Sequence, residues 1–152
     1  AGTTIVSVYI RESKMYWLSV GDSKIYIYRR GQMICPVVEH NYRMLLNRML
    51  ASGQIDRDAY QKELPKAEAL ISYLGLGGLV HIEINQSPFV LEPQDQILLC
   101  SDGLYKSLNE EEILNILNLG MSLDVKAKML LEKALKTGGS RQDNTSIILV
   151  QA

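Results

Sequence analysis

The stretch ILLCSDGLYKSLNEEEI, residues 97–113, joins an apolar run directly to an Asp-Gly pair and then to an acidic segment. The apolar run predicts a buried strand over 96–100. Asp102 and Gly103 alone fit a tight turn, because turns use these residue types. A carboxylate at the end of a buried strand also stands on a rigid support and can hold a hard cation if other carboxylates converge on it. One aspartate does not decide between these two interpretations.

The composition is that of a globular protein and excludes several classes of function. Of 152 residues, 47% are hydrophobic, which favours a single domain over 1–152 with a sizeable core. The 16 Lys and Arg residues are balanced by 17 Asp and Glu residues, so no overall positive field is present to bind nucleic acid. The sequence contains neither an apolar run of roughly 18 residues nor a signal peptide, so we expect a cytoplasmic protein with no membrane partner. Cys35 and Cys100 lie in apolar segments and fit reduced, buried thiols.

Strand and helix signals predict an α+β protein. Alternating apolar residues separated by turns predict strands over 1–10, 15–20, 24–30, 32–38, 79–84, 89–91, 96–100 and 145–150, the first four forming an antiparallel meander. Helical spacing predicts a helix over 40–54, one or two helical pieces over 56–75, where Pro65 forces a break or a fresh first turn, and helices over 110–118 and 122–136.

Capping residues define where these helices begin and end. Asn41 and Asp56 are the expected N-caps of the first two helices, and Gly53 is expected to close the first. Ser107 and Glu110 have the spacing of a capping box at the start of the third. The first residues of the chain already have the alternating pattern of a β-strand, so we expect that an N-terminal part of the fold is missing.

Three aspartates share one local pattern, since each lies beside an apolar strand. They are Asp22 in VGDS, Asp102 in CSDG and Asp143 in QDNTS. In a sandwich of antiparallel sheets, strand ends from distant parts of the chain gather at one edge, so these acids can meet in space. Oxygen ligands of this kind select Mg²⁺ or Mn²⁺. Each acid alone fits a turn, whereas three together favour a metal site.

Four stretches, in this order, resemble motifs of the metal-dependent protein phosphatases of type 2C, the PPM family. They are AGTT (1–4), GDSKIYIYRRGQ (21–32), DQILLCSDGLYKSLNEEEI (95–113) and RQDNTSIILV (141–150). The resemblance covers nearly the whole chain and corresponds to the C-terminal portion of the catalytic domain. It implies a sandwich of two antiparallel β-sheets flanked by α-helices.

The resemblance also implies a function and a set of site residues. The family hydrolyses phosphoserine and phosphothreonine in proteins with a water activated by two Mn²⁺ or Mg²⁺ ions. Asp102 and Asp143 match its metal ligands, and Asp22 matches a residue near a weaker outer metal. The surrounding backbone that shapes the site would come from Gly21, Ser23, Gly103 and Asn144. No other catalytic residue is expected within this chain.

The sequence departs from the family pattern at several positions. An early phosphate-binding Arg and an Asp-Gly-His-Gly segment, which supplies a shared metal ligand, have no counterpart, so the chain alone is expected to be inactive. Glu39 stands where the family has Asp, next to His40. Lys106 stands at a position that is often acidic, which argues against an outer metal. His40 and His81 fit packing or surface roles better than catalytic ones.

These observations leave two functions open. The first is a phosphatase acting on phosphoproteins, of which this chain supplies part of the site. The alternative is a non-catalytic relative that uses the sandwich as a binding or regulatory module. Unpaired strand edges left by the missing part would also favour self-association.

Overall fold

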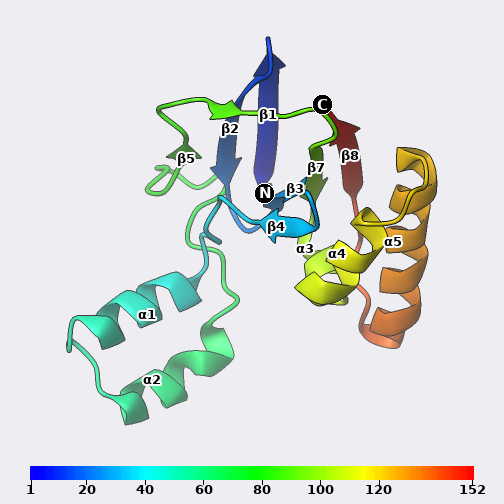
Figure 1. Cartoon of the computed structure of the whole chain (residues 1–152). Coiled ribbons are helices and arrows are strands. Elements are labelled where there is room, and N and C mark those ends of the chain that lie inside the picture. The colour runs from blue at the N-terminus through cyan, green and yellow to red at the C-terminus, as the bar shows by residue number, and fades with distance from the viewer.

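A computed structural model describes residues 1–152, with the side chain of Arg141 excepted (Figure 1). The strands are β1 (Ile5–Arg11), β2 (Lys14–Val20), β3 (Lys24–Arg29), β4 (Gln32–Ile34), β5 (Glu83–Ile84), β6 (Phe89–Val90), β7 (Gln96–Cys100) and β8 (Ile147–Gln151). The helices are α1 (Tyr42–Ala51), α2 (Arg57–Glu63), α3 (Asp102–Tyr105), α4 (Glu110–Leu117) and α5 (Leu123–Gly138), with short 3₁₀ turns η1 (Leu64–Lys66) and η2 (Gly139–Arg141).

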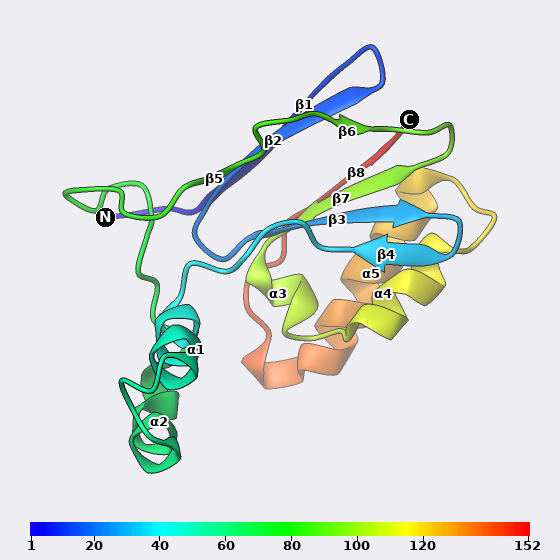
Figure 2. The same cartoon turned by 60° about the vertical axis from the view of Figure 1, so that its left-hand side comes forward.

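The strands form two antiparallel sheets that lie one above the other (Figure 2). In the first sheet β2 pairs with β1 on one side and with β5 and β6 on the other. In the second sheet the strand order is β4-β3-β7-β8. The predicted sandwich of two antiparallel sheets is therefore confirmed.

The prediction of a four-stranded meander is wrong, because the chain changes sheets between β2 and β3. Gly21 makes this crossing with φ of 108°, a conformation that disfavours residues with a side chain. A Cβ at this position would also collide with the side chain of Thr4. The backbone can turn here into the second sheet because residue 21 is glycine.

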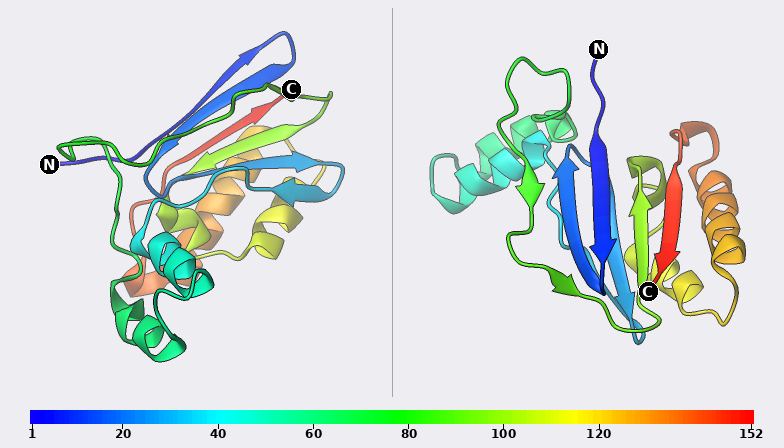
Figure 3. Two further views of the ribbon diagram at one scale, coloured as in Figure 1. Left: turned by 90° about the vertical axis from the view of Figure 1, so that its left-hand side faces the viewer. Right: turned by 90° about the horizontal axis from the view of Figure 1, so that it is seen from above.

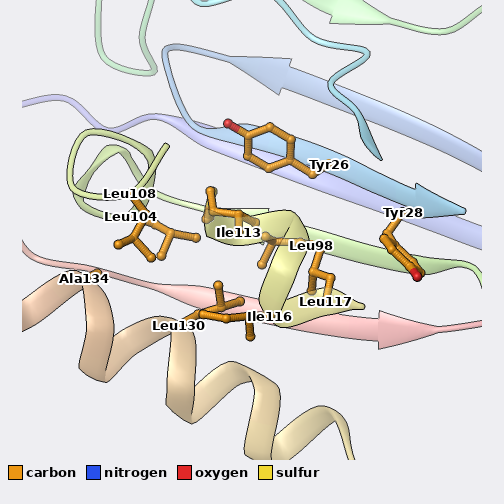
Figure 4. Close-up of a cluster of buried hydrophobic side chains, with 11 residues drawn as sticks. Tyr26, Tyr28, Leu98, Leu104, Leu108, Ile113, Ile116, Leu117, Leu130 and Ala134 are labelled. Atoms are coloured by element: carbon orange, nitrogen blue, oxygen red, sulfur yellow. The ribbon is translucent and has the colours of Figure 1, made fainter. Parts of the chain in front are cut away.

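The two central strands of the second sheet are buried on both faces. From β3 and β7, Ile25, Ile27, Ile97 and Leu99 pack towards the first sheet, in a core with Met15, Val37 and Leu91. The alternate residues Tyr26, Tyr28, Leu98 and Cys100 pack towards the helices, in a core with Leu104, Leu108, Ile113, Ile116, Leu117, Leu130 and Ala134 (Figure 4). Since side chains alternate along a strand, one pair of strands supplies both cores.

The helices cover the two sheets unequally. Helices α3, α4 and α5 lie against the outer face of the second sheet, whereas α1 and α2 project to one side (Figure 3). The outer surface of the first sheet carries several exposed apolar side chains, namely Ile5, Tyr9, Tyr16, Ile84 and Val90. None of the helices among the described residues has the length and apolar character needed to cross a membrane.

The capping predictions are confirmed for the first two helices and wrong for the third. Asn41 and Asp56 accept hydrogen bonds from the backbone of Met44 and Ala59. The capping box of α4 is formed by Asn109 and Glu112 rather than by Ser107 and Glu110. The strand expected over 79–84 is reduced to two residues. The two helical pieces expected over 56–75 are α2 and the turn η1, and Pro65 lies in the first turn of η1 as expected.

An ion pair fastens the end of β3 that lies away from Asp22. The Arg29 guanidinium donates from Nε to Asp95 Oδ1 at 2.9 Å and from Nη2 to Asp95 Oδ2 at 2.6 Å. The Asp95 side chain is only 1% exposed. Burial opposes the charge of Asp95, but the bonds from Arg29 and from the Glu92 amide outweigh it and lower the pKa of this carboxyl.

We therefore expect Arg29→Gln to lower the free energy of unfolding by at least about 2 kcal/mol, because it leaves a buried carboxylate without its cation. Arg30→Gln is the matched control, since Arg30 is the next residue and its side chain is 82% exposed. The depressed pKa of Asp95 contributes stability above the unfolded-state value of 3.8, and this contribution is lost as the pH falls through the folded-state pKa. Urea denaturation at pH 7 and at pH 3 measures both effects. Equal losses in the two variants would contradict the assignment.

Candidate functional site

Asp22 lies in the short link between the two sheets, and neighbouring elements hold this link from several sides. The Gly21 amide donates to Nδ1 of His40 at 3.1 Å, and the Gly21 carbonyl accepts from the His40 amide at 2.8 Å. The Ser23 hydroxyl bonds with that of Thr4 at 3.1 Å. Tyr105 donates to the Asp22 carbonyl at 2.8 Å. The position of Asp22 is therefore fixed through its backbone.

His40 has the structural role that the sequence favours. Its side chain is buried, and its ring nitrogen accepts from the Gly21 backbone. Burial lowers the pKa of the imidazole, and the charge of nearby Glu83 only partly offsets this. The neutral form is the one that can accept this hydrogen bond, so His40 supports the Gly21–Ser23 link.

Asp102 is the first residue of α3, directly after β7, and the segment with Asp143 lies against the same turn. The Gly103 Cα faces this segment so closely that a Cβ would come within 2.7 Å of the Asn144 carbonyl oxygen and 2.8 Å of that of Asp143. Ser101 Oγ donates to the Asn144 carbonyl at 3.1 Å. Asp102 and Asp143 are therefore brought to neighbouring pieces of backbone, although 41 positions separate them in sequence.

Gln142 links the turn at Gly103 to the segment that carries Asp143. Its side-chain amide donates to the Gly103 carbonyl at 3.0 Å and to Thr145 Oγ1 at 2.8 Å, and its Oε1 accepts from Ser107 at 2.8 Å. The carboxylate of Asp143 accepts from the Asn144 amide at 2.7 Å. These bonds hold residues 142–145 in place beside α3.

Charged side chains surround Asp102 and Asp22. Lys106, one turn after Asp102, donates to Asp102 Oδ2 at 2.8 Å and lies 3.7 Å from Glu68 Oε2. Burial, followed by the charge of Asp102, raises the pKa of Asp22, whereas the charge of Lys106 lowers it. Asp22, Asp102 and Lys106 thus form one electrostatic group.

A second ion pair borders this group. Lys24 Nζ lies 2.8 Å from Glu39 Oε1 and 4.0 Å from the centre of the Tyr105 ring. Glu39 also accepts from the Asn41 side chain at 2.8 Å. The glutamate that departs from the family pattern is therefore bound to a cation of its own chain.

Asp102 and Asp143 could supply part of the ligands of an inner metal position. Among the described residues no three His, Cys, Asp or Glu side chains cluster as a metal site. The contact between Gly103 and the Asp143–Asn144 backbone nevertheless places two aspartates of the right chemistry at one edge. The separation of the two carboxylates stays a prediction. An outer position beside Asp22 fits poorly, because Lys106 already binds Asp102.

Comparison with known proteins supports the family resemblance. No family model matches the chain. It is 31% identical over 150 residues to the serine/threonine phosphatase stp of Listeria welshimeri, covering 99% of this chain and 56% of that protein. Its fold matches the serine/threonine phosphatase of S. agalactiae with a TM-score of 0.81 and 26% identity, over 99% of this chain and 60% of the other.

The resemblance to type 2C serine/threonine phosphatases that the sequence predicts is therefore confirmed, since the chain is similar in sequence and in fold to part of such proteins. The chain spans little more than half the length of the curated relatives it matches. A further fold match, with a TM-score of 0.71 and 23% identity, covers 99% of this chain and 58% of the catalytic domain of the phosphatase PstP, solved with two manganese ions.

Sequence reasoning missed two residues of this region. Glu68 reaches Lys106 from the segment after η1, and no local pattern marks it. Gln142 precedes Asp143 directly, but its bonds to Gly103 and Ser107 depend on the tertiary structure. Only the position of Gln142 next to a candidate ligand could have suggested a role for it.

The close approach at Gly103 yields a stability prediction. We expect Gly103→Ala to lower the free energy of unfolding by about 1–3 kcal/mol, because the added Cβ overlaps the backbone of Asp143 and Asn144. Gly120→Ala is the control, since a Cβ there meets no atom within 4 Å. Thermal unfolding of both variants provides the measurement. A Gly103→Ala protein as stable as Gly120→Ala would show that this contact is loose.

Proposed function

We propose that this chain is part of a metal-dependent protein serine/threonine phosphatase, in which Asp102 and Asp143 supply ligands to Mn²⁺ or Mg²⁺. The observation that carries this proposal is the close contact of the Gly103 turn with the Asp143–Asn144 backbone. In a binding module, nothing would require two aspartates to be held at one edge by this contact. Phosphoproteins are the proposed substrates and the cytoplasm the proposed location.

Bound metal ions would supply an activated water and neutralise charge on the phosphoryl group. The chain's own residues prepare the edge for this chemistry. Asp102 stands on the end of β7, a strand whose five residues are all buried, so its backbone has little freedom. Gln142 and Ser101 fix the segment of Asp143. The Gly21 and Ser23 backbone sets the position of Asp22 nearby.

Two carboxylates are too few for a six-coordinate hard ion, so the remaining ligands have to come from water or from outside these residues. This accounts for the expectation that the chain alone turns over little substrate. A non-catalytic binding module is the alternative, and it is favoured by the ion pair between Lys106 and Asp102, which leaves this carboxylate partly neutralised.

The test uses the intact protein that carries this sequence, assayed with p-nitrophenyl phosphate and Mn²⁺. We expect Asp102→Asn and Asp143→Asn each to lower kcat/KM by about 100-fold or more, since each removes a charged ligand. Asp124→Asn is the control, because Asp124 is exposed in the first turn of α5. Metal-dependent turnover that survives both site substitutions would refute the proposal, and absence of turnover in the unsubstituted protein would favour the binding module.

We also propose that the isolated chain self-associates through β1. This strand is at the edge of its sheet, and Tyr9 on it is 60% exposed. Light scattering should show a mass that rises with concentration, and Tyr9→Lys should reduce this rise because lysine on an edge strand opposes pairing. A constant monomer mass in both proteins would contradict the proposal.

A further inference from the structure

The ammonium group of Lys106 lies where carboxylates from different parts of the chain meet. It is 2.8 Å from Oδ2 of Asp102, at the start of α3, and 3.7 Å from Oε2 of Glu68, in the segment after η1. Glu68 is held in turn by Arg43 of α1, at 2.6 Å. The lysine thus contacts both the turn that carries Asp102 and the segment that follows η1.

Asp22 lies beside the same turn. Tyr105, the residue before Lys106, donates to the Asp22 carbonyl at 2.8 Å. The register of β3 with β7 sets Lys24 opposite Cys100, so Asp22 and Asp102 emerge at the same edge of the sheet. Lys24 is bound to Glu39 at 2.8 Å, whereas Lys106 supplies the positive charge that contacts Asp102 at this edge.

We propose that Lys106 is a built-in cation that takes the place of a divalent metal ion between Asp22 and Asp102. The inference rests on the proposed function, in which the same edge binds metal through Asp102 and Asp143. It restricts metal binding to the inner position at Asp102 and Asp143, and it assigns the neighbouring outer position to the Lys106 side chain.

The chemistry of the two cations explains the substitution. An ammonium group and a hard divalent ion seek the same carboxylate oxygens, but the lysine is tethered one turn away and is present at high effective concentration. An ion entering beside Asp22 would also meet the positive charge of Lys106 at close range. The Lys106 side chain carries its positive charge at neutral pH, as lysine side chains ordinarily do.

An ordinary surface ion pair is the simpler interpretation, because the Lys106 side chain is 41% exposed and pairs with a residue four positions away. The two interpretations differ in one measurable quantity. A surface pair has no effect on how many metal ions the protein binds, whereas a built-in cation lowers this number by one.

The experiment counts Mn²⁺ ions bound by the intact protein, from the loss of the free-ion electron paramagnetic resonance signal during titration. We expect Lys106→Asp to bind one more Mn²⁺ than the unsubstituted protein, with an affinity at least about ten-fold higher than any additional binding in the latter. Lys106→Arg, which keeps the cation, should leave the number unchanged. Lys128→Asp is a matched control, because Lys128 lies near Glu132 at the same spacing in α5.

The double variant Lys106→Asp/Asp22→Asn should lose the additional ion, and melting temperatures confirm that each variant is folded. If Lys106→Asp gains no ion, or if the unsubstituted protein already binds an ion that Asp22→Asn removes, the inference is wrong. Because ion counting needs no turnover, a gained ion in a protein without phosphatase activity would uphold this inference while the proposed function failed.

Discussion

The antiparallel pairing of β3 with β7 is the constraint on which the rest of the structure depends. Its register sets Lys24 opposite Cys100, so the residues that precede β3 and those that follow β7 emerge at the same edge. Asp22 and Asp102 are brought near each other by this pairing, although 80 positions separate them in sequence. A slip of one residue would turn every side chain of a strand to the opposite face. Because both faces of these two strands are buried, such a slip would cost much free energy. The register is therefore fixed, and with it the place where Asp22 and Asp102 emerge.

Two kinds of interaction, backbone packing and charge pairing, hold the residues at this edge in place. Backbone contacts around Gly21 and Gly103 fix the backbone positions of the neighbouring Asp22 and Asp102. They leave little space for a residue larger than glycine at positions 21 and 103. The charged side chains beyond them are partly exposed and are held by pairs such as Lys106 with Asp102 and Arg43 with Glu68. Packing therefore determines the backbone of the site, whereas electrostatics determines its outer surface.

Local patterns in the sequence predicted the features that depend on local physics. The apolar run at 96–100 is a strand at the predicted bounds, and Asn41 caps its helix as expected. The capping box was misplaced because Ser107 and Asn109 both precede a glutamate by three positions, and Ser107 is instead bound to Gln142. The change of sheet at Gly21 was missed because a tight turn and a crossing use the same residues. The contact of Glu68 with Lys106 is long-range, so no spacing could reveal it.

The contrast between β7 and the segment before β5 has a consequence for motion. Every residue of β7 is buried and lies between two paired strands, so its amides can exchange with solvent only when the sheets open. Between η1 and β5, most residues are partly or fully exposed and few belong to regular structure, so this segment can open locally. Asp102 therefore stands on a slowly exchanging support, while Glu68 approaches it from a part of the chain that can fluctuate independently.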